Sequence, residues 1–318
     1  DERNSLVGSE MCIRDRILKV HAKKVKMGPA VDMERVAKMT PMFSGADLAA
    51  IINEAAISAT LADKDFVEQV DLEEARDKIK FGRSRKSRVR EKEENKLVAY
   101  HEAGHAVLQA MLKDADPLHK VTIIPRGPTG GATFSLPSKD RMGYSLKWLQ
   151  ATMRIVCGGR IAEEKAMGDV SSGAQQDILQ VTNIARAMIL EWGMSEKLGF
   201  VRYAASDTKE SFMADKDYSQ ETARIIDEEV RRLVDIAFTD AKRLLEESWD
   251  KVVAVAEALL KYETLSGDDV EKIMSGQALA RPTVTEMLVA QAQKLRDATA
   301  TKTSSAPEIP PGAMPLPA

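Results

Sequence analysis

Residues 100–105 read Tyr-His-Glu-Ala-Gly-His, which places two histidines four positions apart with a glutamate next to the first. Residues four apart share one face of a helix, so in a helix His101 and His105 aim their imidazoles at one point. Glu102 lies about 100° round the helix axis, where it can reach a metal-bound water without being a ligand itself. This is the H-E-x-x-H pattern of zinc peptidases, in which the glutamate is the general base. The pattern requires a helix here and favours a metal-dependent hydrolase.

The sequence around this motif has a helical pattern over residues 93–113, with Leu97, Leu108 and Met111 on one face and no proline. Gly104 costs about 1 kcal/mol in a helix interior relative to alanine, which predicts that another backbone or a substrate comes close at this position. The alternative is a buried helix whose histidines are only hydrogen-bonded. The chain has only 4 histidines and two of them are in the motif, which favours the metal site.

The overall composition allows two domains in a chain of 318 residues. A net charge of −3 implies no general affinity for nucleic acid or for an anionic membrane. Two cysteines, Cys12 and Cys157, offer no disulfide framework and favour a cytosolic setting. The sequence contains no run of 18 apolar residues and no signal peptide, so we expect this polypeptide to be soluble by itself.

Composition and periodicity divide the chain into five stretches. These are an irregular segment that we expect to be extraneous to the fold (1–16), a small helical domain (17–82), a basic linker (83–92), a second domain (93–275) and a C-terminal tail (276–318). The tail is rich in Pro, Ser and Ala, and we expect it to be largely disordered because it cannot bury enough apolar surface.

The second domain combines many helical patterns with few strand patterns. β-branched runs predict strands at 120–125 and 132–136, and residues 198–204 are a further candidate for extended structure. The pair Gly158-Gly159 predicts a break between two helices, 145–158 and 159–167. Other helices are expected at 174–192, 219–245 and 250–262, with a short one ending near Met274. The fold class is therefore mainly α with a small β element.

Several separate stretches of residues 17–274 resemble the FtsH family, the membrane-anchored AAA zinc proteases of bacteria, mitochondria and chloroplasts. Besides the zinc motif they are Phe43-Ser-Gly-Ala-Asp-Leu, Asn53-Glu-Ala-Ala, Asp116-Pro-Leu-His-Lys-Val-Thr-Ile-Ile-Pro-Arg-Gly, Gly158-Gly-Arg-Ile-Ala-Glu-Glu, Ser172-Gly-Ala-Gln-Gln-Asp-Ile and Trp192-Gly-Met-Ser. The chain contains no G-x-x-x-x-G-K-[ST] phosphate loop. It resembles the C-terminal part of such a protease, a helical AAA lid followed by a mostly helical zinc-metallopeptidase domain.

The resemblance implies a zinc-dependent endopeptidase, the proteolytic part of an ATP-dependent, membrane-associated degradation machine. The cofactor would be Zn²⁺, with ATP used only when an upstream ATPase core is present. The partners would be unfolded or membrane protein substrates and five further copies of the chain in a homo-hexamer. The location would be the cytoplasmic face of the bacterial inner membrane or its organellar equivalent. The stretch 40–48 resembles the second-sensor region of AAA lids, where Gly45 and Ala46 would lie near the nucleotide base. Membrane contact would come only through N-terminal segments that this chain lacks.

The alternative function is a non-catalytic hexamerisation module with a structural metal. Glu102 argues against it, because a structural site has no use for a base beside its ligands. The strand at 132–136 is a candidate for pairing with an extended substrate.

A catalytic zinc takes three protein ligands and keeps one position open, so a third ligand must come from elsewhere in the chain. The metzincin solution fails, since Leu108 and Met111 stand where its glycine and histidine would be. The residues alone leave three kinds of candidate open, which are Asp177 at a loop-to-helix junction, Glu163 or Glu164, and His119. The family resemblance places the aspartate ligand at Asp177.

Overall fold

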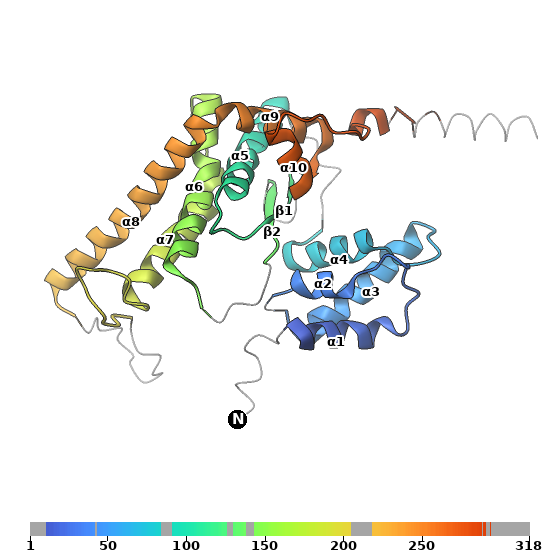
Figure 1. The fold of residues 1–318 in the computed structure, drawn as a ribbon, viewed down its shortest axis with the longest axis horizontal. Coiled ribbons are helices and arrows are strands. Elements are labelled where there is room, and N and C mark those ends of the chain that lie inside the picture. Colours follow the sequence, from blue (N-terminus) through green and yellow to red (C-terminus); the bar gives the residue numbers. More distant parts are fainter. Residues whose placement is uncertain are drawn as a thin grey trace, which may run out of the picture. The chain divides into compact units, whose positions relative to one another are not determined.

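The computed structural model describes residues 11–41, 43–83, 91–125, 130–137, 143–204, 218–287, 289–290 and 293. Residues 1–278 form one compact unit and residues 279–318 a second. The described residues of the first unit are mostly helical and include one small sheet (Figure 1). The expected fold class, mainly α with a small β element, is confirmed. Residues 294–318 of the predicted tail and most of the basic linker lie outside the described residues.

The first helical part consists of α1 (Met11–Ala22), α2 (Met33–Lys38), α3 (Gly45–Leu61) and α4 (Gln69–Phe81). Ser44 begins α3 as a capping box, because its hydroxyl accepts from the Asp47 amide while the Asp47 carboxylate accepts from the Ser44 amide. Leu48, Ile51 and Ile52 of α3 are among the buried residues of a common core, as their helical spacing predicts.

The N-terminal expectation is corrected at residues 11–16. Helix α1 begins at Met11 instead of residue 17, and Arg14 is buried with its Nε donating to the carbonyl of Ala37 at 3.1 Å. These residues are therefore part of the helical fold. The sequence does not reveal this helical turn, because its buried residue is an arginine with a backbone acceptor and gives no apolar periodicity. Residues 1–10 lie outside the described residues.

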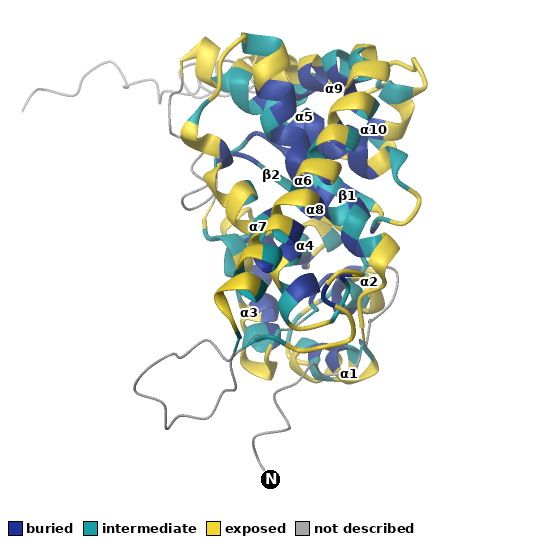
Figure 2. Cartoon of the chain, turned by 90° about the vertical axis from the view of Figure 1, so that its left-hand side faces the viewer, coloured by how far each residue is buried: buried dark blue, intermediate teal, exposed yellow. Residues whose placement is uncertain are grey.

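The second part contains most of the helical length. Its elements are α5 (Lys92–Met111), α6 (Leu146–Met167), the 3₁₀ turn η2 (Ser172–Ala174), α7 (Gln175–Leu190), α8 (Gln220–Glu247), α9 (Trp249–Tyr262) and α10 (Gly267–Met274). Helix α5 packs against α6 on one side and α9 on another, and α8 runs along α6 and α7 (Figure 1). Buried residues are concentrated on α5, which is the central helix of this part (Figure 2).

Helices α5 and α6 touch through their backbones at a pair of glycines. A Cβ atom on Gly104 would lie 2.3 Å from the carbonyl oxygen of Gly158, and one on Gly158 would lie 2.7 Å from the carbonyl oxygen of Gly104. The close approach predicted at Gly104 is thus confirmed. The break predicted at Gly158-Gly159 is wrong, since α6 is continuous from Leu146 to Met167. Tight packing against α5 outweighs the low helix propensity of the two glycines.

We expect Gly104→Ala to destabilise the fold by up to about 2 kcal/mol, because the added methyl group overpacks the helix crossing at a cost of about 1–3 kcal/mol. Better helix propensity offsets about 1 kcal/mol of this cost. Urea unfolding followed by circular dichroism measures it. The control is Gly143→Ala, whose Cβ would meet nothing within 4 Å. A Gly104→Ala variant as stable as the parent would contradict the tight crossing.

The sheet has three strands in the order β2-β1-β3, with both pairs antiparallel. Its strands are β1 (Leu118–Thr122), β2 (Ala132–Ser135) and β3 (Thr264–Ser266). The sequence predicted the first two with shifted ends and missed β3, which is too short to show a pattern. No strand forms over residues 198–204, so that expectation is wrong. Among the described residues, β2 pairs with β1 alone, and Thr133 stands opposite Val121.

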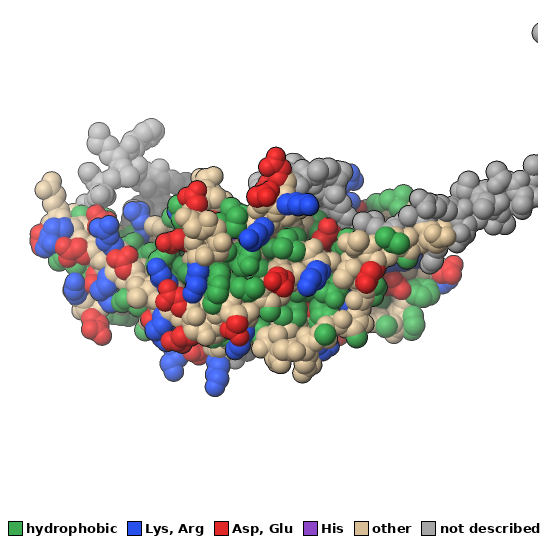
Figure 3. All heavy atoms as spheres, turned by 90° about the horizontal axis from the view of Figure 1, so that it is seen from above, with side chains coloured by type: hydrophobic (Ala, Val, Ile, Leu, Met, Phe, Trp, Pro, Cys, Tyr) green, Lys and Arg blue, Asp and Glu red, His purple; other side chains and the backbone are tan. Residues whose placement is uncertain are grey.

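Acidic and basic side chains are interspersed on the face seen in Figure 3, with hydrophobic side chains between them. Across the described residues, no helix has both the length and the apolarity needed to cross a bilayer.

Candidate metal centre and catalytic base

Three side chains from two helices converge on one point. His101 and His105 project from the same face of α5, and their Nε2 atoms are 3.1 Å apart. Asp177, in the first turn of α7, places Oδ2 3.2 Å from Nε2 of His101 and 3.5 Å from Nε2 of His105. Ligand atoms of a tetrahedral zinc site, with bonds of about 2.0–2.2 Å, are about 3.3–3.6 Å apart. The two imidazoles and the carboxylate therefore fit a zinc ion, and they form a possible metal-binding group.

The other ring nitrogen of each histidine is held by the protein. Nδ1 of His101 lies 2.8 Å from Oε1 of Glu163, and Nδ1 of His105 donates to the carbonyl of Ile155 at 2.7 Å. Glu163 is buried and its second oxygen accepts from the Ser171 hydroxyl at 3.0 Å. These partners direct both Nε2 atoms toward Asp177, as outer partners of metal-binding histidines do.

The cluster is strongly coupled electrostatically. Burial lowers the pKa of His101, but hydrogen bonds to the carboxylates of Asp177 and Glu163 outweigh it and raise the pKa to about 10. Burial raises the pKa values of both carboxyl groups, yet their contacts with the imidazoles hold the pKa of Asp177 and that of Glu163 below the usual range. An imidazole binds a metal ion through a ring nitrogen without a proton, so metal binding by His101 would release a proton from a protonated ring. Burial raises the pKa of the nearby Cys157 to about 12, so its thiol stays protonated.

Glu102 is buried and follows His101 in the chain, and its carboxylate is not among the three converging groups. Its Oε2 accepts a hydrogen bond of 2.7 Å from the Thr133 hydroxyl of β2. Gly159 of α6 leaves the space next to the imidazoles, because a Cβ there would lie 2.5 Å from Cε1 of His101 and 2.6 Å from Nε2 of His105. The sequence pattern identified neither Thr133 nor Gly159 as part of the site.

Two of the other ligand candidates, Glu164 and His119, are not in the converging group. Glu164 is exposed on α6, and His119 is a buried residue of β1. Gly45 and Ala46 are exposed in the first turn of α3, and their contact with a nucleotide base stays a prediction. Glu163 contacts Nδ1 of His101, the ring nitrogen that does not face the point of convergence.

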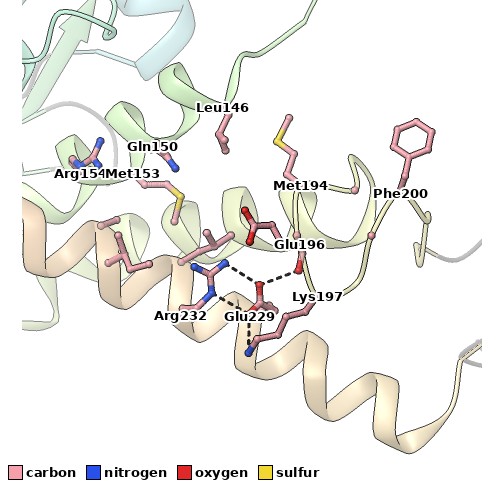
Figure 4. A pocket seen from close by; sticks show the side chains of 16 residues that line it. Leu146, Gln150, Met153, Arg154, Met194, Glu196, Lys197, Phe200, Glu229 and Arg232 are labelled. Carbon is pink, nitrogen blue, oxygen red and sulfur yellow. Dashed lines mark hydrogen bonds and ion pairs between the residues drawn. The ribbon is translucent and has the colours of Figure 1, made fainter.

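A cavity of about 760 Å³ lies between α6, residues 193–200 and α8 (Figure 4). Its wall includes the buried Glu229, whose carboxylate binds Arg232 at 2.9 Å, the Ser195 hydroxyl at 2.9 Å and Lys197 at 3.2 Å. The hydrogen bond from Arg232 is the main reason why the pKa of Glu229 falls to about 2. None of the converging metal-site residues lines this cavity.

Comparison with known proteins finds two family models, one described as peptidase family M41 over residues 88–273 and one as an AAA+ lid domain over residues 30–74. Among the curated relatives, the ATP-dependent zinc metalloprotease FtsH 2 of Methylacidiphilum infernorum is 49% identical over 274 residues, covering 85% of this chain and 43% of the relative. The ATP-dependent zinc metalloprotease FtsH of Myxococcus xanthus is 44% identical over 269 residues, covering 83% and 42%. The chain spans less than half the length of these relatives.

Proposed function

The chain belongs to peptidase family M41, and from that membership we propose that it is a zinc-dependent endopeptidase in which His101, His105 and Asp177 hold Zn²⁺ and Glu102 is the general base. The observation that carries this proposal is the convergence of three ligand atoms within 4.8 Å of one another, with a buried glutamate next to the first histidine. Such a set supplies three ligands and leaves the fourth position open, as catalytic zinc sites do.

The residues divide the work of peptide hydrolysis. When bound, Zn²⁺ supplies Lewis acidity, which lowers the pKa of a coordinated water toward about 7 and polarises the scissile carbonyl. Glu102 takes one proton from the attacking water as the new C–O bond forms. It then delivers this proton to the amide nitrogen as the C–N bond breaks. Glu163 fixes the orientation of the His101 ring during the reaction, because its carboxylate contacts Nδ1 of that ring.

The relatives' names extend the proposal to the whole protein. We infer that this chain is the proteolytic part of an ATP-dependent protease, in which ATP binds an upstream ATPase core and Gly45 and Ala46 of the lid approach the nucleotide base. Unfolded or membrane proteins would be the substrates, in a homo-hexamer at the cytoplasmic face of a bacterial inner membrane or its organellar equivalent. Light scattering on the full-length protein tests the hexamer. The alternative function is a non-catalytic module with a structural metal. It gives no role to Glu102, which is buried beside the proposed ligands.

Zinc removal is the direct test of the proposed chemistry. We expect 1,10-phenanthroline to abolish casein cleavage by this chain and stoichiometric Zn²⁺ to restore it, since the metal both activates water and polarises the carbonyl. The melting temperature should fall on chelation as well, because a ligand that binds only the folded state stabilises it. Mg²⁺ at the same concentration is the control. Full cleavage by protein shown to be free of zinc would refute the proposal.

A further inference from the structure

A threonine on the edge strand β2 contacts the side chain of the proposed general base. The Thr133 hydroxyl donates to Oε2 of Glu102 at 2.7 Å, and Glu102 as a whole residue is 5% exposed. A hydroxyl-to-carboxylate hydrogen bond of this length is charge-assisted, and such bonds are about twice as strong as neutral ones. One oxygen of the base is therefore fixed by β2, which is distant in sequence from α5.

The strand is held so that Thr133 faces the base. Successive residues of a strand point to opposite faces, and the neighbouring Phe134 is buried with 3% exposure. Thr133 pairs with Val121 in the register of β1, so a slip by one residue would expose Phe134. Gly131 allows the chain to come this close, since a Cβ there would lie 2.8 Å from both Cγ and Oε1 of Glu102.

We propose that Thr133 is a positioning residue for Glu102, which holds one carboxylate oxygen so that the other is aimed at the attacking water. The inference rests on the proposed function, because it assigns a role only if Glu102 is the base. A carboxylate on a flexible side chain has several orientations, and only some of them accept the proton in line. Catalytic groups must stay within about 0.5 Å of the productive geometry, and partners such as this hydroxyl provide that restraint.

A second hydroxyl of β2 offers a matched control. The Ser135 hydroxyl accepts from Nε2 of Gln109 at 2.7 Å, so it also ties β2 to α5 through one side-chain hydrogen bond. Gln109 lies two helical turns beyond the base, and its side-chain amide donates to the Asp116 carbonyl and the Ser135 hydroxyl. Loss of the Ser135 bond removes a comparable link between the same two elements and leaves Glu102 with its partner.

The test compares Thr133→Val, Thr133→Ser and Ser135→Ala in the 318-residue chain with a fluorogenic peptide substrate. Valine keeps the shape of threonine without its hydroxyl, and serine keeps the hydroxyl. We expect Thr133→Val to lower kcat by about 10–100-fold, as is typical when a partner that orients a catalytic group is lost. KM should change little, because the bond is not made to the substrate. Thr133→Ser and Ser135→Ala should stay within about threefold of the parent kcat, and all variants should bind one zinc.

A binding measurement gives a second readout that needs no turnover. The Kd of a peptide hydroxamate, which binds zinc and donates a proton to the base, should rise in Thr133→Val and not in Ser135→Ala. The inference is overturned if Thr133→Val keeps the parent kcat and Kd, if Ser135→Ala loses as much, or if Thr133→Ser fails to restore both. Glu102→Gln in the same assays separates the two failures. An active Glu102→Gln overturns the base assignment together with the role of Thr133, whereas an inactive Glu102→Gln beside a fully active Thr133→Val overturns the role of Thr133 alone.

Discussion

Replacement of Glu102 by glutamine is expected to leave zinc bound and to lower peptide hydrolysis by at least about 10²–10⁴-fold. Glutamine has nearly the same shape as glutamate but cannot take up the proton of the attacking water. Since Glu102 is buried beside the ligands and off their face, its change should not disturb the metal. Casein cleavage and zinc content, measured on the same preparations, check this result.

Glu164→Gln is the matched control for that experiment. It makes the same chemical change on an exposed side chain of α6 outside the metal cluster, and its activity should equal that of the parent. If the Glu102→Gln protein carried one zinc per chain and still cleaved casein at the parent rate, proton transfer by Glu102 would have to be abandoned. Loss of zinc from Glu102→Gln would instead show that this residue also supports the ligands.

Asp177→Asn is expected to weaken zinc binding the most among the non-histidine variants, by more than about 100-fold. The amide of asparagine has no negative charge to offset the positive charge of the metal ion. Among the described residues, Asp177 supplies the only carboxylate of the converging group. Glu163→Gln should cost about 10–100-fold, because it weakens the partner that orients His101. Competition with a chromophoric zinc chelator measures these affinities.

His119→Ala is the control for the ligand assignment, since this histidine belongs to β1 and not to the converging group. Its zinc affinity should match that of the parent. Should Asp177→Asn hold zinc as firmly as the parent while Glu163→Gln or His119→Ala releases it, the third ligand would be the residue whose variant lost the metal. An equal loss in all three variants would point to a damaged fold, which the melting temperatures would reveal.

Local sequence was enough to predict the parts of the site that depend on one helix. The spacing of His101 and His105 fixes their common face wherever α5 lies, and the exclusion of Glu102 from that face follows from the same geometry. The proposed third ligand is different, because the distance from Asp177 to the histidines depends on how α7 packs against α6. Spacing along the chain holds no information about that packing. The residues therefore left Asp177, Glu163, Glu164 and His119 open until family resemblance was added.

The wrong predictions have a common physical origin in tertiary contacts. Gly158-Gly159 would break an isolated helix, but close packing of α5 keeps α6 continuous. Strand β3 has three residues and exists through its pairing with β1. The sequence places Thr133 in a strand that could pair with substrate, but nothing in its neighbours along the chain indicates that a carboxylate of α5 lies 2.7 Å away.

The glycines of the α5–α6 crossing make the proposed metal centre depend on the absence of side chains at three positions as much as on functional groups. A saturation mutagenesis screen for activity would rank Gly104, Gly158 and Gly159 next to the histidines, although none of them has a side chain that could bind metal or move a proton. A larger residue at position 159 would occupy the space beside both imidazoles while the H-E-x-x-H letters stayed intact. A homologue with the full motif and bulky residues at these three positions should therefore be classed as an inactive pseudoprotease.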